Sequence, residues 1–224
     1  METSDAIHAW RSIRRWKPDP VPDDVIKKLL EAARRAPSWE NVQPWRFIVI
    51  TDPAVKEKLM ELSFGQKTLR KAPVIIACAG DISAWSRESQ RASLVELRDA
   101  GAVQATDEII DKVFLSNRAF APNLGGDTAI LARTFEQLTY AIGFMLIEAV
   151  NQGLGVCIVG AFGNEVTGEK INEYQNIKSL LNLPEICYLL TLLCIGYPDE
   201  SPPARPRISL AEIAFREQFG SPFE

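Results

Sequence analysis

The pattern of hydrophobic and polar positions predicts helices that alternate with a few short, continuously apolar strands. The clearest amphipathic helix is VPDDVIKKLLEAARRAP, whose apolar residues 25, 26, 29, 30 and 33 recur at helical spacing. Pro22 and two aspartates suit its first turn, and Pro37 ends it. A short helix is expected to be capped by Ser4 or Asp5 and to run to about Trp10. Further helices are expected at 53–64, 86–99, 103–116, 129–152 and 165–181.

Three segments, RFIVIT, PVIIACAG and CYLLTLLCIGY, have the continuous apolar character of buried strands. Strands separated by helices predict an α/β or α+β layer with helices packed over a sheet. The helix expected at 129–152 is apolar nearly all round, which predicts a central position or burial against a partner subunit. The pattern fits a single domain over 1–224.

Composition narrows the range of functions. The 224 residues are 46% hydrophobic, as a well-cored globular domain requires, and the net charge of −4 provides no general basic surface for nucleic acid. The apolar runs are too short or too interrupted to cross a membrane, and the first residues do not resemble a signal peptide, so a cytoplasmic protein is expected. The four cysteines are far apart and His8 is the single histidine, which argues against a zinc site and favours buried, reduced thiols.

Two arginine-bearing stretches could bind an anion. In WRSIRRW, Arg11, Ser12 and Arg14 offer two cations and a hydroxyl within four residues, although a solvated basic surface would have the same pattern. In ARPRISL, Arg205 and Arg207 alternate along a proline-fixed, extended segment, so both point to the same side.

Two further stretches contain more than their local structure needs. APSWENVQPWRF places two tryptophans and several hydrogen-bonding side chains between a helix and a strand; Trp39 and Trp45 could be core residues and Asn41 a turn residue, or the stretch could contact a ligand. In GLGVCIVGAFG, Gly153 suits the end of the long helix, whereas Gly155, Gly160 and Gly163 would let the backbone approach something flat or bulky. The spacing is not GxGxxG and no P-loop occurs, so a Rossmann or NTP-binding site is excluded.

Taken in order, RSIR, APSWENVQPWRF, GLGVCIVGAF, IGYPDE and ARPR resemble the motifs of the FMN-dependent nitroreductase family. The resemblance covers nearly the whole chain except about 84–135, where this family commonly has a variable insert that covers the pocket and selects the substrate. It implies an α+β nitroreductase-like fold, a central mixed or antiparallel sheet flanked by helices, and a C-terminal extension that crosses to the partner subunit. It also implies a homodimer with FMN at the interface.

The resemblance assigns roles to particular residues. Arg11, Ser12, Arg205 and Arg207 would hold the FMN phosphate, and Arg14 would reach the ring at N1 and O2, where reduction leaves negative charge. Backbone N–H groups near the ring N5 and side chains from the partner would complete the site, with Gln66 at the pyrimidine edge. These further positions are Val159, Gly160 and Ala161, and, from the partner, Pro37, Ser38, Trp39 and Asn41.

The activity implied is ping-pong transfer of hydride from NAD(P)H through N5 to a nitroaromatic, quinone, flavin or enone, with no catalytic side chain. Trp10 stands where the family usually has an arginine, and Trp39 where many members have a small residue that leaves more substrate space. The alternatives are a specialised member such as a reductive dehalogenase, and a non-catalytic flavin-binding dimer. A flavin-fragmenting synthase is disfavoured by Ser12 and Asn41, and nucleic-acid binding by the acidic balance.

Overall fold

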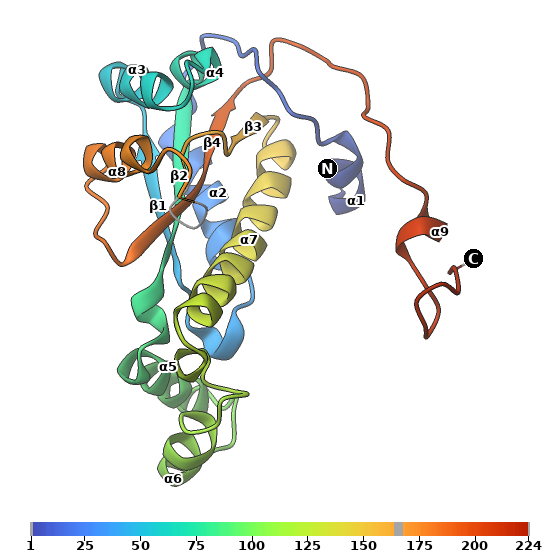
Figure 1. Ribbon diagram of the computed structural model, residues 1–224. Coiled ribbons are helices and arrows are strands. Elements are labelled where there is room, and N and C mark those ends of the chain that lie inside the picture. The colour runs from blue at the N-terminus through green and yellow to red at the C-terminus, as the bar shows by residue number, and fades with distance from the viewer. Residues whose placement is uncertain (1, 164–167, 224) are drawn as a thin grey trace.

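The computed structural model describes residues 2–163 and 168–223 (Figure 1). A four-stranded sheet forms its centre, and helices pack on both faces. The strands are β1 (Trp45–Ile50), β2 (Val74–Asp81), β3 (Gly155–Val159) and β4 (Cys187–Gly196). The helices around the sheet are α2 (Asp23–Arg34), α3 (Pro53–Leu62), α4 (Lys67–Lys71), α7 (Asp127–Asn151) and α8 (Ile171–Leu180).

The strand order in the sheet is β1-β2-β4-β3, and every neighbouring pair is antiparallel. Trp45 lies opposite Gly80 in the β1–β2 pair, and the β2–β4 pair contains an irregularity at Cys78/Ala79. The expected α+β fold with a central sheet flanked by helices is confirmed, and within the described residues the sheet is purely antiparallel.

The central strand β2 is buried along its whole length because both faces of the sheet are covered. Ile76 and Cys78 pack with α2 and α7 in one apolar cluster. Ile75 and Ala77, the alternate residues, pack with α3, α4 and α8 in a second cluster on the other face. This double burial explains why the strand has a continuous apolar sequence rather than an alternating one.

The N-terminal segment lies along the free edge of β3. Ser12 forms a parallel bridge with Val156, and the Ile13 N–H donates to the Val156 carbonyl at 3.0 Å. The indole N–H of Trp16 donates to the Gly155 carbonyl at 3.1 Å. A Cβ at Gly155 would lie 2.6 Å from the Ile13 side chain, so this glycine permits the close approach of the segment.

Helix α7 ends as the sequence predicts. Gly153 has φ +74° and its N–H bonds to the Val150 carbonyl, while the Leu154 N–H bonds to the Ala149 carbonyl, which together form a Schellman motif. The helix begins at Asp127, two residues before the expected start. It is not covered all round, because Tyr140 and Phe144 remain 42% and 46% exposed.

The segment between β2 and α7 forms a lobe at one end of the molecule (Figure 1). It contains η2 (Ile82–Trp85), α5 (Arg87–Asp99), α6 (Asp107–Ile109), a π-helical turn η3 (Ile110–Phe114) and η4 (Pro122–Gly125). Its core is a small cluster of Leu94, Ala105, Ile110 and Leu115. The helix predicted for 103–116 is present but shorter: Thr106 caps its start at Asp107, and it widens into the π turn that ends at Phe114.

Two other boundaries differ from the prediction. Helix α1 (Thr3–Ala9) has Glu2 at its N-cap with no side-chain cap, so Ser4 and Asp5 lie inside the helix. Helix α8 begins at Ile171 rather than near 165, and the 165–167 part of that prediction lies outside the described residues.

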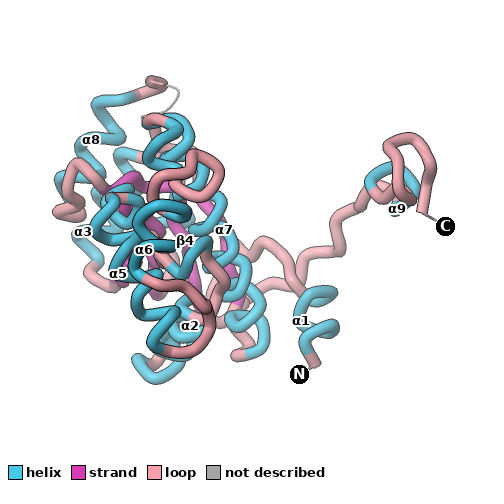
Figure 2. The backbone as a smooth tube through the Cα atoms, turned by 90° about the horizontal axis from the view of Figure 1, so that it is seen from below, coloured by secondary structure: helices cyan, strands magenta, loops and turns pink. Residues whose placement is uncertain are grey.

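After Glu200 the chain leaves the body of the molecule (Figures 1 and 2). The short helix α9 (Leu210–Ile213) of this tail lies away from the sheet. The apolar residues of the tail are exposed, and Phe219 is 92% exposed. No helix within the described residues has the length and apolar character needed to cross a membrane.

Candidate functional site

The five residues predicted to bind the FMN phosphate or the N1 and O2 side of its ring line one small pocket. Its volume is about 40 Å³, enough for a group of a few non-hydrogen atoms such as a phosphate. Trp10, Pro202 and Pro203 complete the lining. The predicted members are Arg11, Ser12, Arg14, Arg205 and Arg207.

Glu200 joins the two segments that form this pocket. Its Oε1 accepts the backbone N–H groups of Arg14, at 2.6 Å, and Arg15, at 3.1 Å. Its Oε2 accepts from Arg15 Nε at 3.1 Å. The Arg14 N–H bond is the largest cause that lowers the pKa of this carboxyl below its usual range. The carboxylate therefore fixes the start of the C-terminal tail against the N-terminal segment.

The cations of the pocket have no carboxylate partner among residues 2–163 and 168–223. The Arg11 guanidinium donates to the carbonyls of His8, at 2.6 Å, and Trp10, at 2.7 Å, and Arg207 donates to that of Pro206 at 3.2 Å. Arg15, next in sequence to Arg14, is instead paired with Glu200. The pocket thus gathers positive charge that carbonyl dipoles orient but do not neutralise.

The stretch that follows β3 comes close to Gln66. Val159 is buried, whereas Gly160 and Ala161 are exposed. Gln66 Nε2 donates to the Ala161 carbonyl at 2.9 Å and to the Ser63 carbonyl at 3.1 Å. A Cβ at Gly160 would meet no atom within 4 Å. The structure therefore places four predicted cofactor residues together around an open strip of backbone.

The other glycines of this stretch have a structural explanation. Besides Gly155 against Ile13, a Cβ at Gly163 would clash with the Lys170 carbonyl. The expected close approach to something bulky is therefore found at Gly155 and Gly163, where the chain itself fills both spaces. Of the three, Gly160 alone faces open space.

The turn between α2 and β1 contains Pro37, Ser38, Trp39 and Asn41, the last two within the 3₁₀ turn η1 (Trp39–Asn41). Trp39 N–H donates to Gln137 Oε1 at 2.7 Å, and its indole N–H donates to the Phe120 carbonyl at 3.2 Å. Ser38 Oγ accepts from the Gln43 N–H at 3.1 Å. Trp45, by contrast, is 7% exposed in the core, so the structural interpretation holds for that tryptophan.

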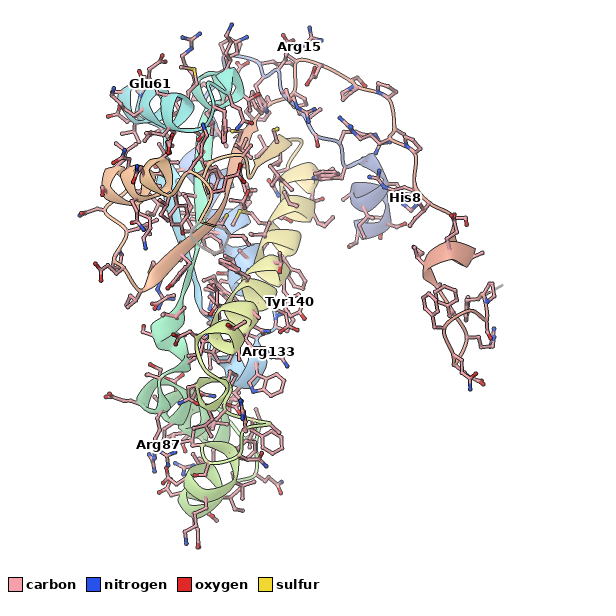
Figure 3. All side chains as sticks on the ribbon, in the orientation of Figure 1. His8, Arg15, Glu61, Arg87, Arg133 and Tyr140 are labelled. Atoms are coloured by element: carbon pink, nitrogen blue, oxygen red, sulfur yellow. The ribbon has the colours of Figure 1, made fainter. Side chains whose placement is uncertain are left out.

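This turn does not meet the pocket within one chain. The Arg133 guanidinium lies 5.0 Å from the Trp39 ring centroid, which places the turn beside the lower half of α7. Figure 3 has Arg133 there and Arg15 near the opposite end of the molecule. The predicted residues therefore form three groups: the pocket, the Gln66 strip, and the distant turn.

Several residues that organise these groups were not singled out in the sequence. Glu200 lies in the IGYPDE stretch, yet its contact with backbone N–H groups 185 and 186 positions away has no local signal. Gln137 is 3% exposed on α7, and its contact with the Trp39 N–H follows no sequence pattern.

The four cysteines are buried and free, as expected. Burial raises the pKa of the Cys78 and Cys194 thiols, which keeps them protonated. In the part of the chain that the structure describes, no group of three or more His, Cys, Asp or Glu side chains is placed to hold a metal ion.

Comparison with known proteins identifies the family of the chain. The model of the nitroreductase family matches residues 7–197. An NADH dehydrogenase of Thermus thermophilus is 34% identical over 203 residues, covering 91% of this chain and 90% of that protein. An FMN reductase [NAD(P)H] of Bacillus subtilis is 26% identical, covering 93% and 71%, and the iodotyrosine deiodinase 1 of Rattus norvegicus is 29% identical, covering 84% and 59%.

The fold is also that of solved relatives. The crystal structure of a nitroreductase-like protein from Streptococcus mutans superposes with a TM-score of 0.80 at 21% identity, covering 96% of this chain and 98% of that one. With the family model spanning most of the chain and a relative at 34% identity over nearly its full length, the predicted kinship is confirmed. The chain belongs to the nitroreductase family.

Proposed function

We propose that this chain is an FMN-dependent oxidoreductase that oxidises NAD(P)H and reduces a small organic acceptor. The observation that carries the proposal is the pocket of four guanidinium groups and one hydroxyl, whose arginines have no carboxylate partner among the described residues. Such a set is matched by a phosphate dianion, which accepts several charge-assisted hydrogen bonds. The FMN reductase relative and the family itself support the same cofactor and donor.

Bound FMN supplies hydride acceptance and release at N5, which permits the donor and the acceptor to react in turn at one site. Arg11, Ser12, Arg205 and Arg207 hold the phosphate. Among Arg11, Ser12 and Arg14, Arg14 is the most exposed. It reaches toward the ring, where its cation stabilises negative charge. Neither step needs a nucleophilic side chain.

The strip at Gly160 and Ala161 supplies the backbone beside the ring. It is exposed, and no side-chain atom of the described residues would meet a Cβ at Gly160. Gln66 fixes the Ala161 carbonyl, so the adjoining backbone is held in one orientation. Val159, whose carbonyl accepts from Thr191 Oγ1 at 2.9 Å, anchors the strip to β4.

We propose that two copies of the chain form the complete site. The turn with Pro37, Ser38, Trp39 and Asn41 is far from the pocket of its own chain but would meet the pocket of a partner. The tail supports this arrangement, since it leaves the body and exposes apolar residues that a second copy would cover (Figure 2). The region 84–135, which contains most of the lobe, adjoins Trp39 through Phe120 and would cover the acceptor. The proposed donors are available in the cytoplasm.

A second candidate reaction is reductive removal of halogen from an aromatic substrate, and the iodotyrosine deiodinase relative favours it. It would use the same cofactor pocket with a different acceptor. Release of free halide from iodotyrosine under reducing conditions would distinguish it from nitro or quinone reduction.

The test is whether the purified protein is yellow and whether NADH or NADPH bleaches that colour anaerobically. We expect one FMN per chain, bleaching by a nicotinamide donor, and return of colour when a quinone or nitroaromatic is added. Bound FMN that neither donor reduces would identify a non-catalytic flavin-binding dimer and overturn the enzymatic proposal. Failure to bind added FMN would overturn the cofactor assignment.

A further inference from the structure

The turn between α2 and β1 has an unusual backbone. Glu40, Asn41 and Gln43 have φ values of 47°, 57° and 47°, so three non-glycine residues within four positions are left-handed. Residues held in this region persist only where the surrounding structure fixes them, and they concentrate at functional sites. The question is which contacts hold this turn.

Helix α5 supplies two of these contacts, and both involve Glu40. Ser93 Oγ donates to the Glu40 carbonyl at 2.5 Å, and Gln90 Nε2 donates to Glu40 Oε2 at 2.9 Å. Gln90 is fully buried and Ser93 is 8% exposed, so the contacts lie inside the interface between the turn and the helix. Glu40 itself is half-buried.

The same side-chain pair contains two buried oxygen atoms with no hydrogen-bond partner among the described residues, Glu40 Oε1 and Gln90 Oε1. Each accepts hydrogen bonds, and neither can donate one when the carboxyl is ionised. A buried acceptor without a partner is unfavourable. One proton on Glu40 Oε1 would satisfy both atoms, because a carboxylic acid and a primary amide can each donate to the other.

We propose that Glu40 is a neutral carboxylic acid in the folded protein, paired in both directions with the Gln90 amide, and that this pair positions the Trp39–Gln43 turn. The amide N–H donates to Oε2, and the carboxyl O–H on Oε1 donates to Gln90 Oε1. With the Ser93 bond, α5 then holds both the side chain and the backbone of the left-handed residue. Glu40 is a positioning residue and does not touch the reacting atoms.

The surrounding charges are consistent with a neutral carboxyl. Burial is the largest influence and raises the pKa of Glu40, opposed first by the hydrogen bond from Gln90. The arginines of the elements around the turn are paired with other acids: Arg87 and Arg91 of α5 with Asp111, Arg98 with Asp99 and Asp107, Arg133 of α7 with Glu136, and Arg46 of β1 with Asp81.

The role of the pair in catalysis rests on the proposed function, in which this turn lines the FMN of a partner subunit. An ionised Glu40 would add a negative charge between Trp39 and Asn41 and leave Gln90 Oε1 unpaired. The neutral pair avoids both. The neutral pair stabilises the folded protein. This stabilisation is complete below the ordinary glutamate pKa and is lost as pH rises through the raised pKa of Glu40 in the folded protein.

The experiment compares the FMN-loaded parent with Glu40→Gln. Glutamine keeps both hydrogen bonds as an amide pair and removes the titration, whereas Glu88→Gln, on the exposed side of α5, is the matched control. At about pH 6, well above the ordinary glutamate pKa of about 4.3, the parent's infrared spectrum should contain a protonated-carboxyl band that Glu40→Gln lacks and Glu88→Gln retains. Glu40→Gln should also lose the parent's decline in stability and kcat/KM toward higher pH.

The absence of that band at pH 6, or a pH profile unchanged by Glu40→Gln, would overturn the proposal. Selective ¹³C labelling of glutamate gives the titration of the parent directly, so the test does not depend on the folding of a variant. The band does not depend on turnover: its presence in a protein that fails to bind FMN would uphold the acid–amide pair while overturning the proposed function.

Discussion

The molecule contains two arginine clusters that differ in their partners. In the lobe, Arg87, Arg91 and Arg98 face aspartates, and the ion pairs include Arg98–Asp107 at 2.7 Å. In the pocket, Arg11, Arg14, Arg205 and Arg207 have no carboxylate partner among residues 2–163 and 168–223. We call these the paired cluster and the unpaired cluster.

This difference shows that the number of arginines alone does not indicate a ligand site. The paired cluster is neutralised by Asp99, Asp107 and Asp111 from its own lobe. The unpaired cluster is formed by two segments that lie almost 200 residues apart in the chain. Glu200 joins these segments, but its carboxylate is engaged by backbone N–H groups and Arg15. Only the second arrangement leaves positive charge to be matched by an anion from outside.

The strongest test of the comparison removes members of the unpaired cluster. Arg11→Ala and Arg207→Ala should each weaken FMN binding by about 1.5–3 kcal/mol, roughly 10–150-fold in Kd, because the phosphate loses a charge-assisted hydrogen bond. Fluorescence titration of apoprotein with FMN measures the change. Arg98→Ala, from the paired cluster, is the matched control and should leave Kd unaltered. Equal Kd values for all three variants and the parent would place the phosphate elsewhere.

A second test targets the residue that joins the two segments of the pocket. Glu200→Ala should lower the free energy of unfolding by about 0.5–1.5 kcal/mol, because the exposed Arg14 and Arg15 N–H groups exchange their carboxylate acceptor for water. Since the folded pKa of Glu200 is lowered, the parent should lose this stability as pH falls below the ordinary glutamate value, and the variant should not. Urea unfolding at several pH values measures both effects. Parallel pH profiles for parent and variant would show that Glu200 is not a stabilising anchor.

The smallest effect is expected in the paired cluster. Arg91→Ala should leave the free energy of unfolding nearly unchanged, since its ion pairs are exposed and screened by solvent. Thermal unfolding monitored by circular dichroism is the measurement. A loss of FMN affinity in this variant would erase the distinction between the two clusters.

The sequence was sufficient for much of the fold because local patterns and burial agree. The apolar runs of β2 and β4 required cover on two faces, and α2 carries Ile26, Leu29 and Ala33 inward at helical spacing. Gly153 ended α7 as its place in the sequence predicts. The lobe was less predictable. Thr106 caps a helix that begins only at Asp107, and this helix then widens into a π turn within one polar stretch.

For the site, the sequence identified residue types but not how they are held. The arginines of the pocket were identifiable by their spacing and by family resemblance, whereas Glu200, Gln137 and Gln90 act through contacts 50 or more positions away along the chain. The close approach at Gly163 was predicted, but not its partner, which is the Lys170 carbonyl of the same chain. Long-range backbone contacts of this kind leave no periodic signal.

The bridge between Ser12 and Val156 has a further consequence. The segment that carries Arg11 and Arg14 is also the cover of the outer edge of β3, where exposed backbone groups would otherwise be free to pair with another molecule. Substitutions that detach this segment would therefore do more than weaken a ligand: they would uncover a sheet edge and make the protein prone to aggregate. Engineering of the arginines is safest where two bonds to β3 are kept: the Ile13 N–H bond to Val156 and the Trp16 indole bond to Gly155.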